Sequence, residues 1–242
     1  TTTWAVTTAA ASLNFDTRTA DNHKMVKVDT NHFVDFYSGE AADGFAQVFT
    51  VYTTTWAVTT SSTRLEFDTV ALSSDGPIMV DANHVLVLWG GNASDGFAEV
   101  FTVNTTTWAI TTAATALEFD TRNCAAPAVE QIDTTHFVGI WYGGSTGQEV
   151  FAQAFTVNTT TWAVTTAADS LQIDSTAGDL SRKNMDMVQI DDNHYLIGYS
   201  NNTTAAGAFV VQVITVSTST WAVTTTTDPF QVDAGGATFQ AP

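Results

Sequence analysis

Short apolar segments recur along the chain, separated by stretches rich in Gly, Asn, Asp, Ser and Thr. The most apolar of them begin with histidine and end with an aromatic residue, and they cover residues 32–37, 84–89, 136–141 and 194–199. A short and nearly continuous apolar run predicts a β-strand buried on both faces. The segments with Trp-Ala-Val-Thr alternate more and are rich in Thr, which predicts strands with one solvated face.

These segments belong to a tandem repeat with three sets of recurring positions. The first set is the tryptophan of Thr-Thr-Thr-Trp or Thr-Ser-Thr-Trp, the second is an aspartate twelve residues later, and the third is an Asp-x-x-His turn. Three sets that keep step with one another exclude chance and predict a repeat architecture. The tryptophans, at intervals of 52, 52, 54 and 59 residues, are Trp4, Trp56, Trp108, Trp162 and Trp221; the aspartates are Asp16, Asp68, Asp120, Asp174 and Asp233; the turns are Asp29/His32, Asp81/His84, Asp133/His136 and Asp191/His194.

Each unit is predicted to form four strands, which in the first unit cover residues 24–28, 32–37, 44–51 and either 4–6 or its copy 56–58. The turns carry Gly, Asn, Asp and Ser, and the insertions that lengthen later units can be placed in loops. About 50 residues with four strands is the size of one blade of a β-propeller. We therefore expect an all-β fold, a β-propeller of four-stranded antiparallel blades, with four complete repeats and one extra strand.

The expected domain is single and covers residues 1–242. Its repeats span about 1–52, 53–104, 105–158 and 159–217, with a partial repeat at 218–242. The extra strand, residues 4–6, leaves three ways to complete the array: a small ring with a redundant strand, a piece of a larger ring, or an open array completed by another chain. Because the chain begins inside a repeat, we expect a processed protein or a fragment of a longer one.

Three motifs resemble a repeat of large bacterial and phage surface proteins: Leu-Glu-Phe-Asp-Thr at 65–69 and 117–121, the Asp-x-x-His-Phe turn, and Asp-Gly-Phe-Ala at 43–46 and 95–98. The resemblance covers nearly the whole chain and implies a β-propeller. It implies little about activity, since propellers carry unrelated functions. The third and fourth units depart from it where Asp-Gly-Phe-Ala is expected.

The charge is strongly negative, with 25 acidic and 7 basic residues and a net charge of −18. Nucleic acids and anionic membrane surfaces both need clustered Lys and Arg, so neither is an expected partner. The chain holds no run of 18 apolar residues, so no membrane insertion is expected. The acidity favours a salty or extracellular setting. The resemblance to repeats of bacterial and phage surface proteins implies a cell-surface or virion-surface location.

The candidate ligand-binding residues are aromatic side chains that precede a loop, together with nearby aspartates: Tyr37, Trp89, Trp141, Tyr199, Asp43 and Asp95. An aromatic ring at a loop mouth, with Gly and Asp beside it, suits stacking on a sugar. Packing between blades is the alternative explanation for a ring that recurs once per unit.

The remaining motifs favour structural roles. A catalytic dyad is needed in one place with a nucleophile, whereas Asp-x-x-His recurs in every unit, as expected of a turn in which the aspartate accepts backbone N–H groups. The aspartates twelve residues after each tryptophan are expected to close turns or to bond between blades, and a ring of them around a cation is the alternative. Each tryptophan is expected in the core or an interface, and Cys124 is expected to be an incidental thiol.

No phosphate loop, Cys/His cluster or G-x-S-x-G motif is present, and the acids recur with the units. We therefore predict no cofactor and no enzymatic activity. The expected function is binding or adhesion, possible partners being glycans or a cell-surface polymer, and repetition would add avidity. The alternative is a structural surface protein that self-associates into a filament, sheath or capsid decoration.

Overall fold

A computed structural model describes residues 8–18, 20–70, 72–144, 149–175, 185–201 and 208–233. The described residues form β-strands and two short 3-10 turns, η1 (Glu40–Ala42) and η2 (Asn92–Ser94). Within them, no helix is long and apolar enough to cross a membrane. The fold is therefore all-β, as predicted, while the extra strand expected at residues 4–6 lies outside the described residues.

The strands group into four antiparallel sheets, which we call blades 1 to 4. Blade 1 contains β1 (Asp21–Lys27), β2 (His32–Ser38), β3 (Gly44–Val51), β4 (Val58–Thr60) and β5 (Leu65–Asp68). Blade 2 contains β6 (Ser74–Met79), β7 (His84–Gly90), β8 (Gly96–Val103), β9 (Ile110–Thr112) and β10 (Leu117–Asp120). Blade 3 contains β11 (Ala125–Gln131), β12 (His136–Gly143), β13 (Glu149–Val157), β14 (Val164–Thr166) and β15 (Leu171–Asp174). Blade 4 contains β16 (Met185–Gln189), β17 (His194–Asn201), β18 (Ala208–Val216), β19 (Val223–Thr225) and β20 (Phe230–Asp233).

The fourth strand position of every blade is divided between two short strands that pair with the same neighbour. In blade 1, β4 pairs with residues 49–51 of β3 and β5 pairs with residues 44–46. The Gln47 side chain spans the interruption, because its Nε2 donates to the Ser62 carbonyl at 2.8 Å. Gln153 and Gln212 do the same in blades 3 and 4. Each blade is therefore a four-stranded sheet with an interrupted outer strand.

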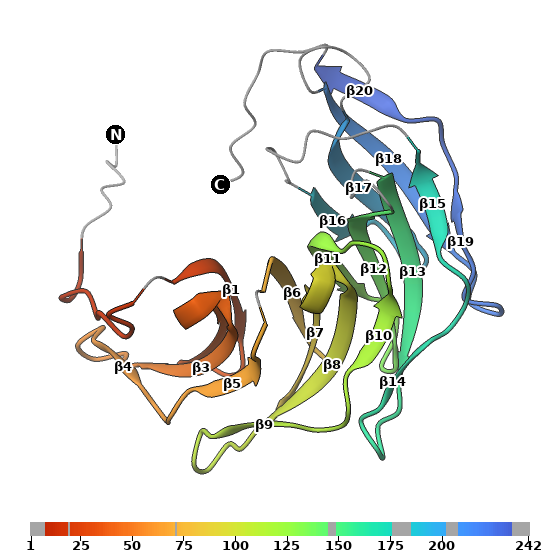
Figure 1. Cartoon of the computed structure of the whole chain (residues 1–242). Coiled ribbons are helices and arrows are strands. Elements are labelled where there is room, and N and C mark those ends of the chain that lie inside the picture. The colour runs from red at the N-terminus through yellow and green to blue at the C-terminus, as the bar shows by residue number, and fades with distance from the viewer. Residues whose placement is uncertain are drawn as a thin grey trace.

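The blades lie side by side in an arc, with β1, β6, β11 and β16 innermost (Figure 1). Three clusters of buried apolar residues form the core, and each joins two successive blades. The second strands of blades 2 and 3, β7 and β12, each lie between two such clusters, and in β7 every residue is buried. The second strands of blades 1 and 4 each adjoin one cluster. This confirms the predicted burial on both faces for the His-led segments at 32–37, 84–89 and 136–141. The segment at 194–199 departs from the prediction, since Leu196 on one of its faces is 37% exposed.

The Asp-x-x-His turn and the repeated tryptophan together form one contact between blades. Asp29 accepts hydrogen bonds from the backbone N–H groups of Asn31 and His32, both at 2.8 Å. Its carboxylate also lies 2.9 Å from the imidazole Nδ1 of His32. The ring of His32 stacks on Trp108 of the next blade, with centroids 3.4 Å apart. The same stacks join His84 to Trp162 and His136 to Trp221. The structural roles predicted for the turn and for these three tryptophans are therefore confirmed.

The tryptophans lie in a turn rather than in the predicted strand. Trp56, Trp108, Trp162 and Trp221 all have φ between 58° and 60°, and the strand begins two residues later. A positive φ is uncommon for a residue with a bulky side chain. In blades 2 to 4 this conformation accompanies the contact of the indole with the histidine of the preceding blade.

Candidate functional site

The aromatic residues predicted to bind a ligand pack inside the molecule. Tyr37, Trp89, Trp141 and Tyr199 have exposed fractions of 0%, 3%, 0% and 1%. Each is in the second strand of its blade, and Trp89 and Trp141 belong to the core clusters between blades. A ligand in solvent cannot stack on rings with so little exposed surface. The placement of Trp89, Trp141 and Tyr199 fits inter-blade packing instead of the predicted sugar stacking, and Tyr37 is covered by Phe15 and His23.

The aspartates of the Leu-x-Phe-Asp segments hold two of these rings in place. The indole Nε1 of Trp89 donates to Asp68 at 2.8 Å, and that of Trp141 donates to Asp120 at 3.0 Å. These contacts confirm the expected inter-blade hydrogen bond. The described residues contain no group of three or more His, Cys, Asp and Glu residues placed to hold a metal ion.

Asp43 and Asp95 end the two 3-10 turns and are half-buried. Their backbones close the loops: the N–H of Asp43 donates to the Glu40 carbonyl, and the N–H of Asp95 donates to that of Asn92. Both lie at the opposite end of the second strand from the Asp-x-x-His turns. The structure therefore places them in loop turns and brings neither beside an exposed aromatic side chain of the predicted set.

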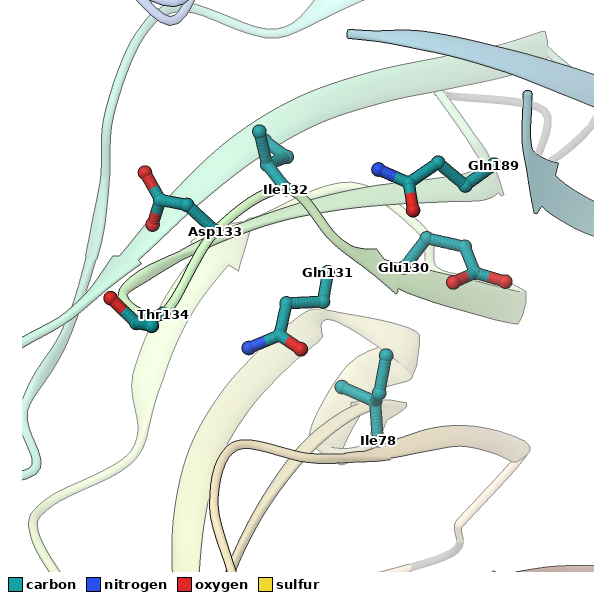
Figure 2. Close-up of a pocket in the computed structure, with 7 residues that line it drawn as sticks. All are labelled: Ile78, Glu130, Gln131, Ile132, Asp133, Thr134 and Gln189. Atoms are coloured by element: carbon teal, nitrogen blue, oxygen red, sulfur yellow. The ribbon is translucent and has the colours of Figure 1, made fainter. Parts of the chain in front are cut away.

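A polar pocket of about 440 Å³ lies where the innermost strands of blades 2, 3 and 4 approach one another. Glu130 and Gln131 come from β11, Gln189 comes from β16, and Ile78 comes from β6. The turn after β11 adds Ile132, Asp133 and Thr134. In Figure 2, Glu130 and Gln189 lie at one end of this group and Asp133 and Thr134 lie at the other. Carboxylates, amides and a hydroxyl therefore share one concave surface with two aliphatic side chains.

The electrostatics of the pocket are dominated by Glu130. Burial raises the pKa of its carboxyl group, repulsion from Asp186 raises it further, and the backbone N–H of Gln131 opposes both effects. Asp133 differs: hydrogen bonds from Thr135 and His136 outweigh its desolvation and lower its pKa. Carboxylate oxygens accept hydrogen bonds, so both acids can accept from the hydroxyl groups of a ligand.

The far wall of the pocket is held by a tyrosine. The hydroxyl of Tyr195 donates to the Gln131 carbonyl at 3.3 Å, and Gln189 Nε2 donates to this hydroxyl at 3.4 Å. Burial raises the pKa of Tyr195 to about 12, so its hydroxyl keeps its proton and stays a donor. Blades 3 and 4 are thereby joined directly behind Gln131.

Sequence reasoning missed this pocket, although the repeat contains a signal for it. Glu130 pairs with Val138, and the corresponding positions in the other blades are Val26, Ile78 and Val188. A carboxylate therefore replaces an aliphatic side chain in blade 3 only. A search for residues that break the repeat, instead of those that obey it, would have found Glu130.

Solved structures with the same fold include proteins of different activities. The first is described as "a putative 6-phosphogluconolactonase" from Bacteroides uniformis, with a TM-score of 0.62, 13% identity, and coverage of 87% of this chain and 55% of that one. The second is SapL1 lectin with alpha methyl fucoside, with a TM-score of 0.52, 9% identity, and coverage of 86% and 64%. The third is Aleuria aurantia lectin with alpha-methyl-L-fucoside, with a TM-score of 0.50, 8% identity, and coverage of 85% and 58%. Each of these proteins contains more chain than the four blades match. The fold is that of a β-propeller.

No protein-family model matches the chain, and no curated protein matches it. The comparisons nevertheless correct one prediction, namely that the protein is not an enzyme. The propeller fold is shared with a protein described as "a putative 6-phosphogluconolactonase" as well as with lectins, so recurrence of the acids with the blades is no ground for excluding catalysis.

Proposed function

We propose that the protein is a carbohydrate-binding β-propeller and that the sugar occupies the pocket around Glu130. The observation that carries the proposal is the convergence of Glu130, Gln131 and Gln189 from two blades, in which Glu130 replaces the aliphatic residue that the other blades carry at its position. Sugars are bound by a few convergent polar groups beside apolar surface, which Ile78 and Ile132 supply here. The fold shared with two lectins that hold methyl fucosides supports this choice of ligand class.

Each side chain has a distinct part in this proposal. Glu130 and Asp133 bond sugar hydroxyls, and Gln131 and Gln189 complete the polar wall with amide groups that both donate and accept. The aliphatic side chain of Ile78 covers the apolar face of the ring. Action outside the cell remains part of the proposal and is tested separately, by locating the protein in the organism that makes it.

The test is a glycan array, followed by calorimetry with the best sugar. We expect Glu130→Ala and Gln189→Ala each to weaken binding by about tenfold or more, because each removes a hydrogen-bonding group from a desolvated contact. The matched control is Gln172→Ala, which removes an exposed amide from β15, outside the pocket. Incubation of the bound sugar with the protein, followed by chromatography, shows whether it is also converted. The absence of any sugar ligand, or equal affinity of the Glu130 variant and the wild type, would refute the proposal.

A further inference from the structure

Every junction between successive blades is built from the same positions. At the first junction, Val34 and Val48 of blade 1 pack with Val85, Phe101, Val103 and Ile110 of blade 2. His32 stacks on Trp108 across the same junction. We call the face of a blade that carries the positions of His32, Val34 and Val48 its leading face. The face that carries the positions of Val85, Phe101, Val103, Trp108 and Ile110 is its receiving face. The structure therefore defines two complementary faces whose pairing occurs three times in the chain.

The receiving face of blade 1 lacks a blade against it within the described residues. Phe33, Phe49, Val51 and Val58 occupy the positions of Val85, Phe101, Val103 and Ile110, and together with Leu13, Phe15 and Met25 they line an apolar groove of about 390 Å³. Trp56 is 55% exposed, whereas its three described counterparts are half-buried beneath a histidine. This face carries the tryptophan and the groove, and no histidine of the described residues stacks on Trp56.

The leading face of blade 4 has no receiving face packed against it within the described residues. Leu196 is 37% exposed, although its counterparts Val34, Leu86 and Val138 are fully buried. Val188 and Ile190, from β16 and its following turn, are also exposed. The His194 side chain is 35% exposed, compared with 11% to 17% in the three stacked histidines, although Asp191 orients it in the same way. This face carries the histidine and the aliphatic side chains, and the described residues place no tryptophan against it.

Side chains of opposite charge lie at the inner edges of the two terminal blades. Lys24 and Lys27 are exposed on β1 at the inner edge of blade 1, whereas Asp186 and Asp192 are exposed in and beside β16 at the inner edge of blade 4. In a chain with only 7 basic residues, this placement opposes the general repulsion between copies. The occupant that fits the groove of blade 1 is therefore a blade of this same kind.

We propose that the leading face of blade 4 docks on the receiving face of blade 1 in a second copy of this chain. Leu196 then enters the groove between Phe33, Val51 and Val58, and His194 stacks on Trp56. The contact is head-to-tail, since it joins two different faces. Two copies that make it twice form a closed ring of eight blades, within the usual range for propellers.

Residues 13–16, near the N-terminal end of the described chain, occupy part of the surface on which β20 of a docked blade 4 would lie. Phe15 packs edge-on against Tyr37 and Phe49, as Phe67 packs against Trp89 and Phe101 at the first junction. Phe15 therefore already occupies the place that Val232 of an incoming blade 4 would take. Val232 and Phe230 are exposed on β20, whereas Asp16 beside Phe15 is held by Arg64 at 2.5 Å. In the docked pair, residues 13–16 of the receiving copy keep their position. Strand β20 of the other copy is therefore displaced from the position that β5 has at the first junction.

The test uses one variant for each face and measures mass by light scattering and sedimentation. Trp56→Asp places a charge on the receiving face, and Leu196→Asp places one on the leading face; both side chains are partly exposed, so folding should tolerate the change. The wild type is expected to associate in a concentration-dependent manner, and each variant alone to associate about tenfold or more weakly. An equimolar mixture of the two variants is expected to form a dimer, because one intact face of each kind remains.

The control is Val70→Asp, which adds the same charge at an exposed residue after β5 and should leave association unchanged. Circular dichroism confirms the fold of every variant, and His194→Ala replaces Leu196→Asp if that chain does not fold. A wild type that remains monomeric at the highest soluble concentration would overturn the proposal. Association of either single variant at wild-type strength, or a mixture that stays monomeric, would overturn the head-to-tail arrangement.

Discussion

Glu99 occupies, in blade 2, the position that the other blades fill with Gln47, Gln153 and Gln212. The three glutamines donate to a carbonyl in the interruption of the outer strand, at 2.6 to 2.8 Å. An ionised carboxylate cannot donate there, and burial raises the pKa of Glu99 to about 7. The protonated form of Glu99 is thus the one that can replace glutamine in this role.

Stability should therefore depend on pH through Glu99. The folded-state pKa lies above the unfolded value, so the stabilising contribution is complete below about pH 4.5 and is lost as pH rises through about 7. We expect Glu99→Gln to raise the free energy of unfolding at pH 8 by up to about 3 kcal/mol and to change it little at pH 5. Urea unfolding at the two pH values measures this. An equal effect of the substitution at both values would contradict the assignment.

At the scale of elements, the sequence located strands well and the tryptophan turn poorly. The strand predicted over residues 44–51 has the bounds of β3, and the His-led strands begin at the predicted histidines. Both kinds of strand can be recognised because their apolar residues either alternate with polar ones or form a short continuous run. Trp56 was placed in a strand because no Gly or Asn marks its positive φ, and the histidine that contacts its counterpart Trp108 is 76 residues away in the sequence. A contact over that distance leaves no local pattern.

The His–Trp stack can be weighed by comparing two histidines. His84→Ala removes the stack on Trp162 and the hydrogen bond to Asp81, whereas His194→Ala removes only the bond to Asp191 among the described contacts. We expect His84→Ala to lower the free energy of unfolding more, by about 0.5–1.5 kcal/mol, at concentrations where the protein is monomeric. Chemical denaturation of both variants measures the difference. Equal losses would mean that the stack adds nothing to the turn itself.

The sequence did not predict where the candidate pocket lies, because its residues come from the innermost strands and not from the predicted aromatic positions. The pattern of the repeat places the predicted sugar site at Tyr37 and Trp89, but both rings are buried, Trp89 between blades 1 and 2 and Tyr37 beneath Phe15 and His23. The pocket depends instead on which inner strands meet at the centre, and that follows from how the blades pack, not from the pattern within one unit. Only Glu130, as a break in the repeat, was visible in advance.

At the scale of the molecule, blades contact their neighbours along an arc, so stability should vary along it. Blades 2 and 3 are packed between two blades, whereas blades 1 and 4 each have one face on which the described residues place no other blade. We expect amide hydrogens of β8 and β13 to exchange more slowly than those of β18 in the monomer. Exchange measured by mass spectrometry at low concentration tests this, and a protection of β18 equal to that of β13 would contradict it. At high concentration the docking proposed above should slow exchange in β18.

The identical junctions also bear on how such an array changes in length over evolution. Since each histidine meets a tryptophan about 76 to 85 residues further along, duplicating one repeat within the gene inserts a blade that has both halves of the contact. Deleting one repeat by recombination likewise joins a leading face to a receiving face. Blade number can then drift by whole units without any compensating mutation in the core, while a specialised residue such as Glu130 is gained or lost with the single copy that carries it.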